Sequence, residues 1–270
     1  MDDAVFVLDG DVATPTELAR GPWGPDAAHG GAPAGLLAAL IERRAEPQRL
    51  TRITIELLRP VPLAPLAAHA AGEAGRTVGR WSASLAAGGR TVARATAVSC
   101  RTAPLDVPPA AEERLPFPDA AEPLRIPGMP DVRSFYYTAM EGRLASGSVT
   151  RPGPAAVWLR LRCPLVAGAE PSGFVRAVAA ADFASGTSWE LPFGPYRYVN
   201  ADLTVWVHRP PAGEWIGVDA ATTLDATGTG VTETRLFDRD GRVGGAQQTL
   251  VVSAAEPAST RTDPRVEETS

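Results

Sequence analysis

The chain has 270 residues, 44% of them hydrophobic, with a formal net charge of -5 and a pI near 5.3. This length and apolar content are enough for one large domain or two fused small ones. The acidic balance argues against a nucleic-acid-binding protein, because such proteins depend on clustered positive charge. No window approaches about 18 uninterrupted apolar residues, so the sequence predicts no membrane span.

The N-terminus, MDDAVFVLDGD, lacks the basic region and the long apolar core of a signal peptide. The two cysteines, Cys100 and Cys163, are far apart and have no metal-like spacing with the three histidines. Isolated cysteines in a reducing compartment are most often small buried apolar residues. We therefore expect a cytoplasmic protein with no metal site and no cofactor.

The first predicted helix covers residues 34–43, in the stretch GPWGPDAAHGGAPAGLLAALIER. Its start is unusual, because His29, two glycines and Pro33 stand where an ordinary capping residue is expected. Proline suits the first turn of a helix, where its missing N–H group has no partner to lose.

Two strand patterns follow this helix. TRITIELLRP places Ile53, Ile55 and Leu57 on one face, which is typical of a strand with one buried face. RWSASLAAGGRTVARATAVS reads as two strands joined by a Gly88-Gly89 turn, which is a strong hairpin signal. Between residues 103 and 132, eight prolines remove backbone donors and predict an extended linker.

The second half repeats the first. A helical pattern lies near Phe174–Ala184, and ADLTVWVHRP repeats the alternation of TRITIELLRP at an offset of 150 residues. Asp240-Gly241 marks a second hairpin, in which Gly241-Arg242 lies 152 residues after Gly89-Arg90. The alternative is chance similarity between alanine- and valine-rich strands. Repetition decides architecture before single motifs do, so we predict an α+β fold of two helix-plus-meander repeats with one continuous sheet.

The predicted organisation has four parts. They are a first repeat over 1–102, a proline-rich linker over 103–132, a second repeat over 133–256 and a disordered tail over 257–270. A helix wrapped by an antiparallel sheet and duplicated in one chain is the architecture of a double hotdog.

Several motifs resemble the acyl-CoA thioesterase II-like double-hotdog proteins, particularly their actinobacterial branch. They include Trp23 with His29-Gly30-Gly31, the RPVP step from Arg59, AADFASG from Ala180, NADLTVWVHRPPAGEWIGVDA and FDRDGRVGGAQQTLVV. Together they span almost the whole chain between its termini. The resemblance implies hydrolysis of an acyl-CoA or acyl-carrier-protein thioester, although a hotdog fold alone does not fix function.

Thioester hydrolysis needs a held and deprotonated water, and donors for the developing oxyanion. The resemblance implies an Asp, a Thr and a Gln, all in the second half. The Asp falls on Asp182, whose alternative role is a helical acid or a cap. The Thr falls on Thr223 or its neighbour Thr222, and since adjacent strand residues face opposite ways, only one can face the site; Thr223 is preferred. The Gln is Gln248 or, less favoured, Gln247, and a glutamine here could instead satisfy a buried backbone group.

The resemblance also accounts for the unusual helix start. In this fold the central helix directs its first N–H groups at the thioester carbonyl, and Gly30 and Gly31 permit close approach of a ligand. His29-Gly30-Gly31 is therefore the predicted substrate-binding segment. His29 could polarise the carbonyl, but a histidine before a helix is more often structural.

Two other classes stay open: a non-catalytic acyl-thioester-binding protein, and a hotdog hydratase or lyase. Hydratases usually pair a histidine with a carboxylate on the helix, and Asp182 has no histidine beside it in the sequence. No G-x-S-x-G elbow supports a serine hydrolase. We expect no nucleic-acid or membrane partner, and self-association into a homodimer or higher homo-oligomer, because the sheet leaves two outer edges.

Overall fold

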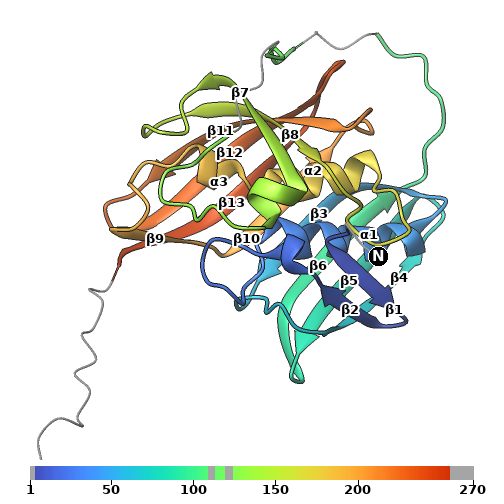
Figure 1. Ribbon diagram of the computed structural model, residues 1–270. Coiled ribbons are helices and arrows are strands. Elements are labelled where there is room, and N and C mark those ends of the chain that lie inside the picture. The colour runs from blue at the N-terminus through green and yellow to red at the C-terminus, as the bar shows by residue number, and fades with distance from the viewer. Residues whose placement is uncertain (1–3, 109–112, 119–123, 256–270) are drawn as a thin grey trace, which may run out of the picture.

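The computed structural model describes residues 4–108, 113–118 and 124–255. In these ranges the chain forms one 13-stranded sheet around two central helices, α1 (Gly31–Ala45) and α2 (Gly173–Ala181) (Figure 1). The strands of the first half are β1 (Phe6–Asp9), β2 (Val12–Pro15), β3 (Arg49–Leu57), β4 (Leu66–Ala74), β5 (Val78–Ala87) and β6 (Arg90–Cys100). Those of the second half are β7 (Met140–Gly147), β8 (Ala155–Leu161), β9 (Tyr196–Asn200), β10 (Asp202–Val207), β11 (Trp215–Leu224), β12 (Thr229–Asp238) and β13 (Gly241–Ala254).

The sheet runs in the order β1-β2-β4-β5-β6-β3-β10-β13-β12-β11-β8-β7, with β9 paired to β13. The two halves join at β3 and β10, which pair antiparallel. Thr54 lies opposite Thr204, and their hydroxyl groups are 3.0 Å apart. These threonines are 150 residues apart, so equivalent residues of the two repeats meet at a pseudo-two-fold axis. The predicted double hotdog with one continuous sheet is confirmed.

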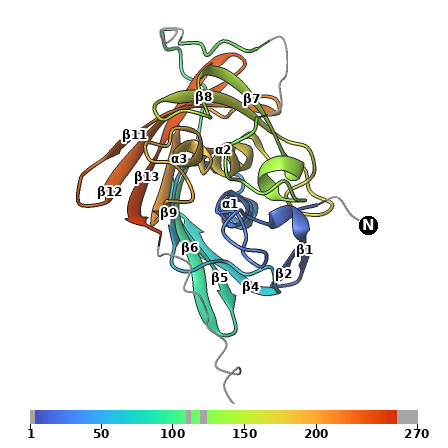
Figure 2. The ribbon, with the colours of Figure 1, turned by 60° about the vertical axis from the view of Figure 1, so that its left-hand side comes forward.

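The two helices pack directly on each other inside the curved sheet (Figure 2). Close approach depends on small residues, since a Cβ at Gly31 would lie 2.5 Å from the carbonyl oxygen of Ala179. Large apolar side chains fill the space between helix and sheet, among them Leu36, Leu37, Ile41, Ile53 and Ile55, all fully buried. Truncating one of these leucines to alanine would cost about 2–5 kcal/mol.

The repeats differ between helix and first strand. The helices start 142 residues apart, at Gly31 and Gly173, whereas the strands repeat at an offset of 150. The second repeat therefore holds eight more residues at this place. They accommodate a short helix, α3 (Ala184–Thr187), and β9, so the helix predicted near Phe174–Ala184 ends earlier than expected.

The described residues also form a 3-10 turn at Glu17–Ala19 and a π-helical turn at Phe135–Ala139. Both predicted hairpins are present, between β5 and β6 and between β12 and β13. Gly88 and Gly89 both have positive φ, at 54° and 74°, as the tight turn between β5 and β6 requires. Cys100 and Cys163 are not joined in a disulfide, and both are half-buried, not fully buried as expected.

The described parts of the predicted linker contain no helix or strand. Residues 113–118 lie against the second half, where Trp158 donates its indole N–H to the carbonyl oxygen of Pro116 at 2.8 Å. The predicted boundaries at 102 and 132 stay predictions, and the predicted tail over 257–270 lies outside the described residues.

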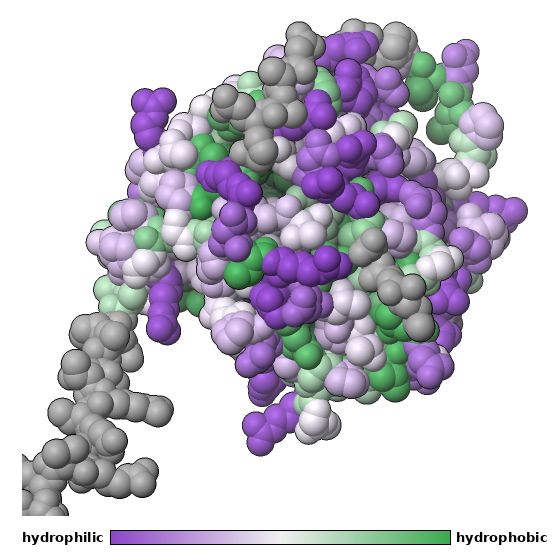
Figure 3. Space-filling view, viewed as in Figure 1, coloured by the Kyte–Doolittle hydropathy of each residue, from purple (hydrophilic) through white to green (hydrophobic). Residues whose placement is uncertain are grey.

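The surface is mixed in polarity. In Figure 3, hydrophilic residues are spread over the visible face with smaller apolar patches between them. Within the described ranges, none of the helices combines the length and the apolar character that a membrane crossing needs.

Candidate active site

Asp182 lies directly after α2, at its C-cap position, and its side chain is 4% exposed. Three polar groups surround its carboxylate. Asn200 Nδ2 and Gln248 Nε2 donate to Oδ1 at 3.1 and 3.4 Å, and His29 Nδ1 lies 3.1 Å from Oδ2. A carboxylate in so buried a place is costly unless hydrogen bonds compensate, and charges act more strongly there than in water.

Ser185, in α3, fixes the orientation of both amides. Its backbone N–H donates to Gln248 Oε1 at 3.2 Å, and its hydroxyl donates to Asn200 Oδ1 at 3.1 Å. With their oxygens held in this way, both amides present their NH₂ groups to Asp182. Thus α3 and the break between β9 and β10, where Asn200 stands, build one side of the site.

His29 comes from the first half, just before α1. Its ring stacks on Phe183 at 4.5 Å between centroids, and its side chain is 12% exposed. Nδ1 also lies 3.1 Å from the backbone nitrogen of Gly31. The two contacts compete for one atom: a protonated Nδ1 donates to Asp182, whereas an unprotonated Nδ1 accepts from Gly31. The absence of a neighbouring histidine in the sequence is thus misleading, because the fold brings His29 to Asp182.

Gly30 occupies the N-cap position of α1 and touches the same carboxylate. A Cβ added there would lie 2.8 and 2.9 Å from the two carboxylate oxygens of Asp182, closer than real Cβ contacts. Its φ of -56° is ordinary, so close approach accounts for the glycine and backbone strain does not. The start of α1 and the end of α2 therefore meet at one point, which joins the predicted substrate-binding segment to the predicted catalytic carboxylate.

The expected threonine is not in this cluster. Thr222 points inward and is 6% exposed, whereas Thr223 is exposed on the outer face of β11, so the preference for Thr223 as the inward residue is wrong. The alternation of β11 decides this, because the face that packs on the helices carries residue 222. The Thr222 hydroxyl bonds Ser188 and Thr232, each at 2.8 Å.

On β13, Gln248 is fully buried and Gln247 is exposed. The structure therefore places Gln248 in the cluster and Gln247 outside it.

Asn200 and Ser185 are the members that the sequence analysis missed. Both lie inside motifs that carry the resemblance, but in the sequence neither differs from an ordinary polar loop residue. Asn200 ends β9 and precedes β10, so it lies outside the alternating run that revealed the strand. Its only sequence signal is an asparagine directly before a predicted buried strand.

The first half contains no second copy of this cluster. The pseudo-two-fold axis, the helix starts and the pairing of β3 with β6 and of β10 with β13 identify the equivalent positions. All three are apolar: Leu40 for Asp182, Leu50 for Asn200 and Ala97 for Gln248. Among the described residues, the carboxylate with its two amides therefore stands where α2 ends and has no copy at the equivalent positions of the first half. In the part of the chain that the structure describes, no group of three or more His, Cys, Asp or Glu residues gathers as a metal site.

Comparison with known structures supports the same fold. A candidate thioesterase from Novosphingobium aromaticivorans is 21% identical, with a TM-score of 0.71 over 92% of this chain and 98% of the other. A hot dog fold protein of unknown function from Alicyclobacillus acidocaldarius is 17% identical, with a TM-score of 0.71 over 93% and 96%. Acyl-CoA thioesterase II TesB2 from Mycobacterium marinum is 14% identical, with a TM-score of 0.67 over 93% and 94%. At these identities the likeness establishes the fold alone.

Family models give a more specific result, although no curated protein sequence matches the chain. The model of the acyl-CoA thioesterase N-terminal domain matches residues 19–100. The model of the acyl-CoA thioesterase C-terminal domain matches residues 109–252, more than half of the chain. The chain therefore belongs to the acyl-CoA thioesterase family.

Proposed function

We propose that this protein hydrolyses the thioester of an acyl-CoA or an acyl-carrier protein by direct attack of a water held at Asp182. The observation that carries the proposal is the buried carboxylate of Asp182. It follows α2, lies against the start of α1 and has two amides oriented toward it. Membership of the acyl-CoA thioesterase family supports the substrate class.

In the proposed reaction, Asp182 accepts a proton from the water, and the resulting hydroxide attacks the thioester carbonyl carbon. Asn200 and Gln248 hold the carboxylate and the water in place. When His29 Nδ1 donates to Asp182, the backbone N–H of Gly31 at the start of α1 is available to stabilise the oxyanion, because a helix N-terminus favours negative charge. The carbon–sulfur bond then breaks, and the departing thiolate takes up the proton. No covalent intermediate forms with the protein.

In this proposal Asn200 fills the place for which the resemblance implies a threonine. An amide can donate to the carboxylate as a hydroxyl would, and it is longer by one atom. Thr222 then has a structural role, since its contacts anchor the end of α3 to the sheet through Ser188 and Thr232. His29 holds Asp182 from the other side and orients it.

The function test is thiol release from acyl-CoA substrates of increasing chain length, detected with a thiol reagent. A catalytically silent acyl-binding protein would bind these thioesters without releasing thiol. The His29–Asp182 pair favours one second candidate, a hydratase of enoyl thioesters, because a histidine and a carboxylate at 3.1 Å is a usual acid–base pair. Loss of the ultraviolet absorbance of an enoyl thioester, without thiol release, would identify that reaction instead.

Gly30→Ala tests whether the start of α1 belongs to the site. Its new methyl group must displace the carboxylate of Asp182, so we expect at least about a tenfold loss of turnover with the fold retained. Gly24→Ala is the matched control, because a Cβ there meets nothing within 4 Å. Equal activity of both variants would place the reaction elsewhere.

We also propose that the protein self-associates through the outer edge of its sheet at β7, because the opposite edge, β1, is already hydrogen-bonded to residues 164–167. Light scattering should return a mass above the 28.2 kDa of one chain. A monomer at micromolar concentration would contradict this.

A further inference from the structure

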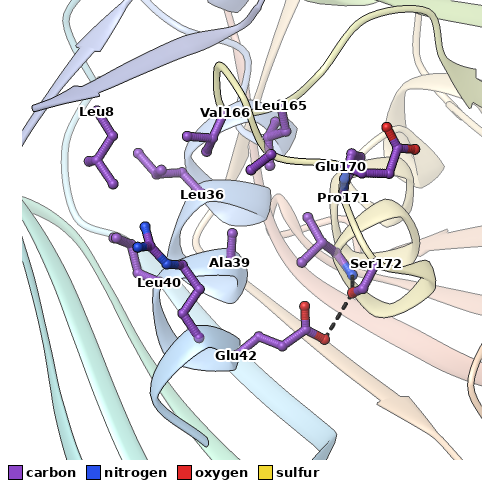
Figure 4. Close-up of a pocket in the computed structure, with 13 residues that line it drawn as sticks. Leu8, Leu36, Ala39, Leu40, Glu42, Leu165, Val166, Glu170, Pro171 and Ser172 are labelled. Carbon is purple, nitrogen blue, oxygen red and sulfur yellow. Dashed lines mark hydrogen bonds between the residues drawn. The ribbon is translucent and has the colours of Figure 1, made fainter. Parts of the chain in front are cut away.

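A cavity of about 80 Å³ lies away from Asp182, between the C-terminal half of α1 and the segment that leads into α2 (Figure 4). Apolar side chains form most of its wall, with Leu36, Ala39 and Leu40 from α1 facing Leu165 and Val166. None of the residues that line it belongs to the cluster around Asp182 or takes part in the proposed reaction.

The position of the cavity follows from the pseudo-two-fold axis. The site at Asp182 is built where the start of α1 meets the end of α2, and the cavity lies where the start of α2 meets the later turns of α1. With the helix starts matched, Ser172 is equivalent to Gly30, and Leu40 is equivalent to Asp182. The cavity is therefore the counterpart of the proposed active site in the other half of the duplication.

Four of the lining residues are polar: Arg43, Glu170, and a hydrogen-bonded pair formed by Ser172 and Glu42. Ser172 donates its hydroxyl to Glu42 Oε1 at 2.8 Å, and the other carboxyl oxygen of Glu42 points toward the middle of the lining residues (Figure 4). Burial raises the pKa of Glu42. The hydrogen bond from Ser172 offsets part of this rise, and the nearby charge of Glu46 adds a smaller contribution that also raises the pKa. The raised pKa favours a carboxyl group that can donate a hydrogen bond to a carbonyl oxygen.

We propose that this cavity binds a short aliphatic acyl group, as the thioester or as the free carboxylic acid, without hydrolysing it. The apolar wall takes the chain, and Glu42 with Ser172 contacts the carbonyl or carboxyl end. The ligand class rests on the proposed function, because the cavity is the counterpart of a site for acyl thioesters. The small volume of the cavity, about 80 Å³, limits the acyl chain to a short one.

This site does not hydrolyse a thioester, because it lacks the chemical groups that the proposed reaction uses. The positions of the water-activating carboxylate and of both amides carry Leu40, Leu50 and Ala97, so no carboxylate stands where Asp182 stands in the other site. Glu42 lies two residues farther along α1 and is engaged by Ser172.

The test is ¹⁹F NMR of the full chain with two probes, which also detects weak binding. One is a short-chain acyl-CoA analogue in which a methylene group separates the carbonyl from sulfur and the chain ends in CF₃. The other is the matching free trifluoro-carboxylate. We expect two bound resonances with at least one probe, and the probe that gives them identifies the thioester or the free acid as the ligand. A single bound resonance with both probes overturns the inference.

Ala39→Trp, which fills the cavity, should remove one bound resonance and leave thiol release within about twofold. Arg44→Trp is the matched control, because Arg44 is exposed on the same helix and does not line the cavity. Glu42→Leu should weaken binding of the probe that gives the same resonance by roughly tenfold. This variant is the one to use if Ala39→Trp lowers the melting temperature. Retention of both resonances in both variants overturns the inference. If the protein releases no thiol but gives two bound resonances, the proposed function is refuted and the inference about the cavity stands.

Discussion

Asp182→Asn separates the role of the carboxylate as a base from its role as a hydrogen-bond acceptor. The substituted amide keeps an oxygen at the place of Oδ1, where Asn200 and Gln248 donate. Its NH₂ group takes the place of Oδ2 and can donate to an unprotonated His29 Nδ1. The change therefore preserves size and most contacts, and it removes the negative charge and the ability to take a proton from water.

The expected size of the effect follows from these contacts. Loss of a general base lowers turnover by roughly 10²–10⁴-fold, or about 2.7–5.4 kcal/mol in activation free energy. Stability should change little or rise, because the variant no longer places a charge on a side chain that is 4% exposed. Substrate affinity should also be nearly unchanged, because in the proposed reaction Asp182 acts on the water and not on the substrate.

The assay is thiol release over a range of substrate concentrations, with a melting curve for each variant. Asp202→Asn is the matched control, because Asp202 is close in sequence to Asn200 but caps the backbone N–H of Thr249 on the exposed side. A folded Asp182→Asn protein with wild-type turnover on its best thioester would refute the mechanism. A lowered melting temperature with equally lowered affinity would instead show that Asp182 is a structural cap.

Three further outcomes are expected. Ser185→Ala should cost about tenfold in turnover with little change in affinity, because it frees the amide of Asn200 to rotate; unchanged turnover would show that the serine does not orient the site. Thr222→Ala should lower the free energy of unfolding by about 1–3 kcal/mol, because it removes the hydrogen-bond partner of the buried Thr232 hydroxyl and one of the two bonds of Ser188, whereas the exposed Thr223→Ala should not; chemical denaturation of both variants measures this. Burial raises the pKa of Asp238, but hydrogen bonds from Arg209 and from two backbone N–H groups hold it below its ordinary 3.8. The ionised Asp238 thus contributes fully to stability above pH 3.8, and this contribution is lost as the pH falls through the lowered pKa. In Asp238→Asn the free energy of unfolding should therefore depend less on pH below about pH 4; the same pH dependence in wild type and variant would contradict this.

The sequence contains most of the information that determines the fold. Strand alternation with an offset of 150 predicts that equivalent strands pair, and Thr54 opposite Thr204 is the direct result. The place of the first helix is also predictable, because a glycine pair directly before an apolar helical pattern marks its entry. The boundaries of the second helix are not predictable, since an eight-residue insertion shifts the offset there and only packing shows where α2 ends.

The site is less predictable, for a physical reason. Alternation tells which residues of a strand share a face, but it does not tell which face meets the helices, so Thr222 and Thr223 could not be distinguished. His29 and Asp182 are far apart in the sequence, and only the packing of α1 on α2 makes them neighbours. Asn200 stands at the break between β9 and β10, and the alternating sequence pattern that predicts β10 does not reach it.

The duplication shows why the site needs both halves. The first half supplies the helix start, with His29 and Gly30, and the second supplies the carboxylate and both amides. In a pseudo-two-fold arrangement this division automatically produces a second place with the roles of the helices exchanged. There the start of α2 faces leucine in place of aspartate, so the proposed hydrolytic groups stand at one of the two places. The cavity beside Glu42 shows that the second place keeps an open space without those groups.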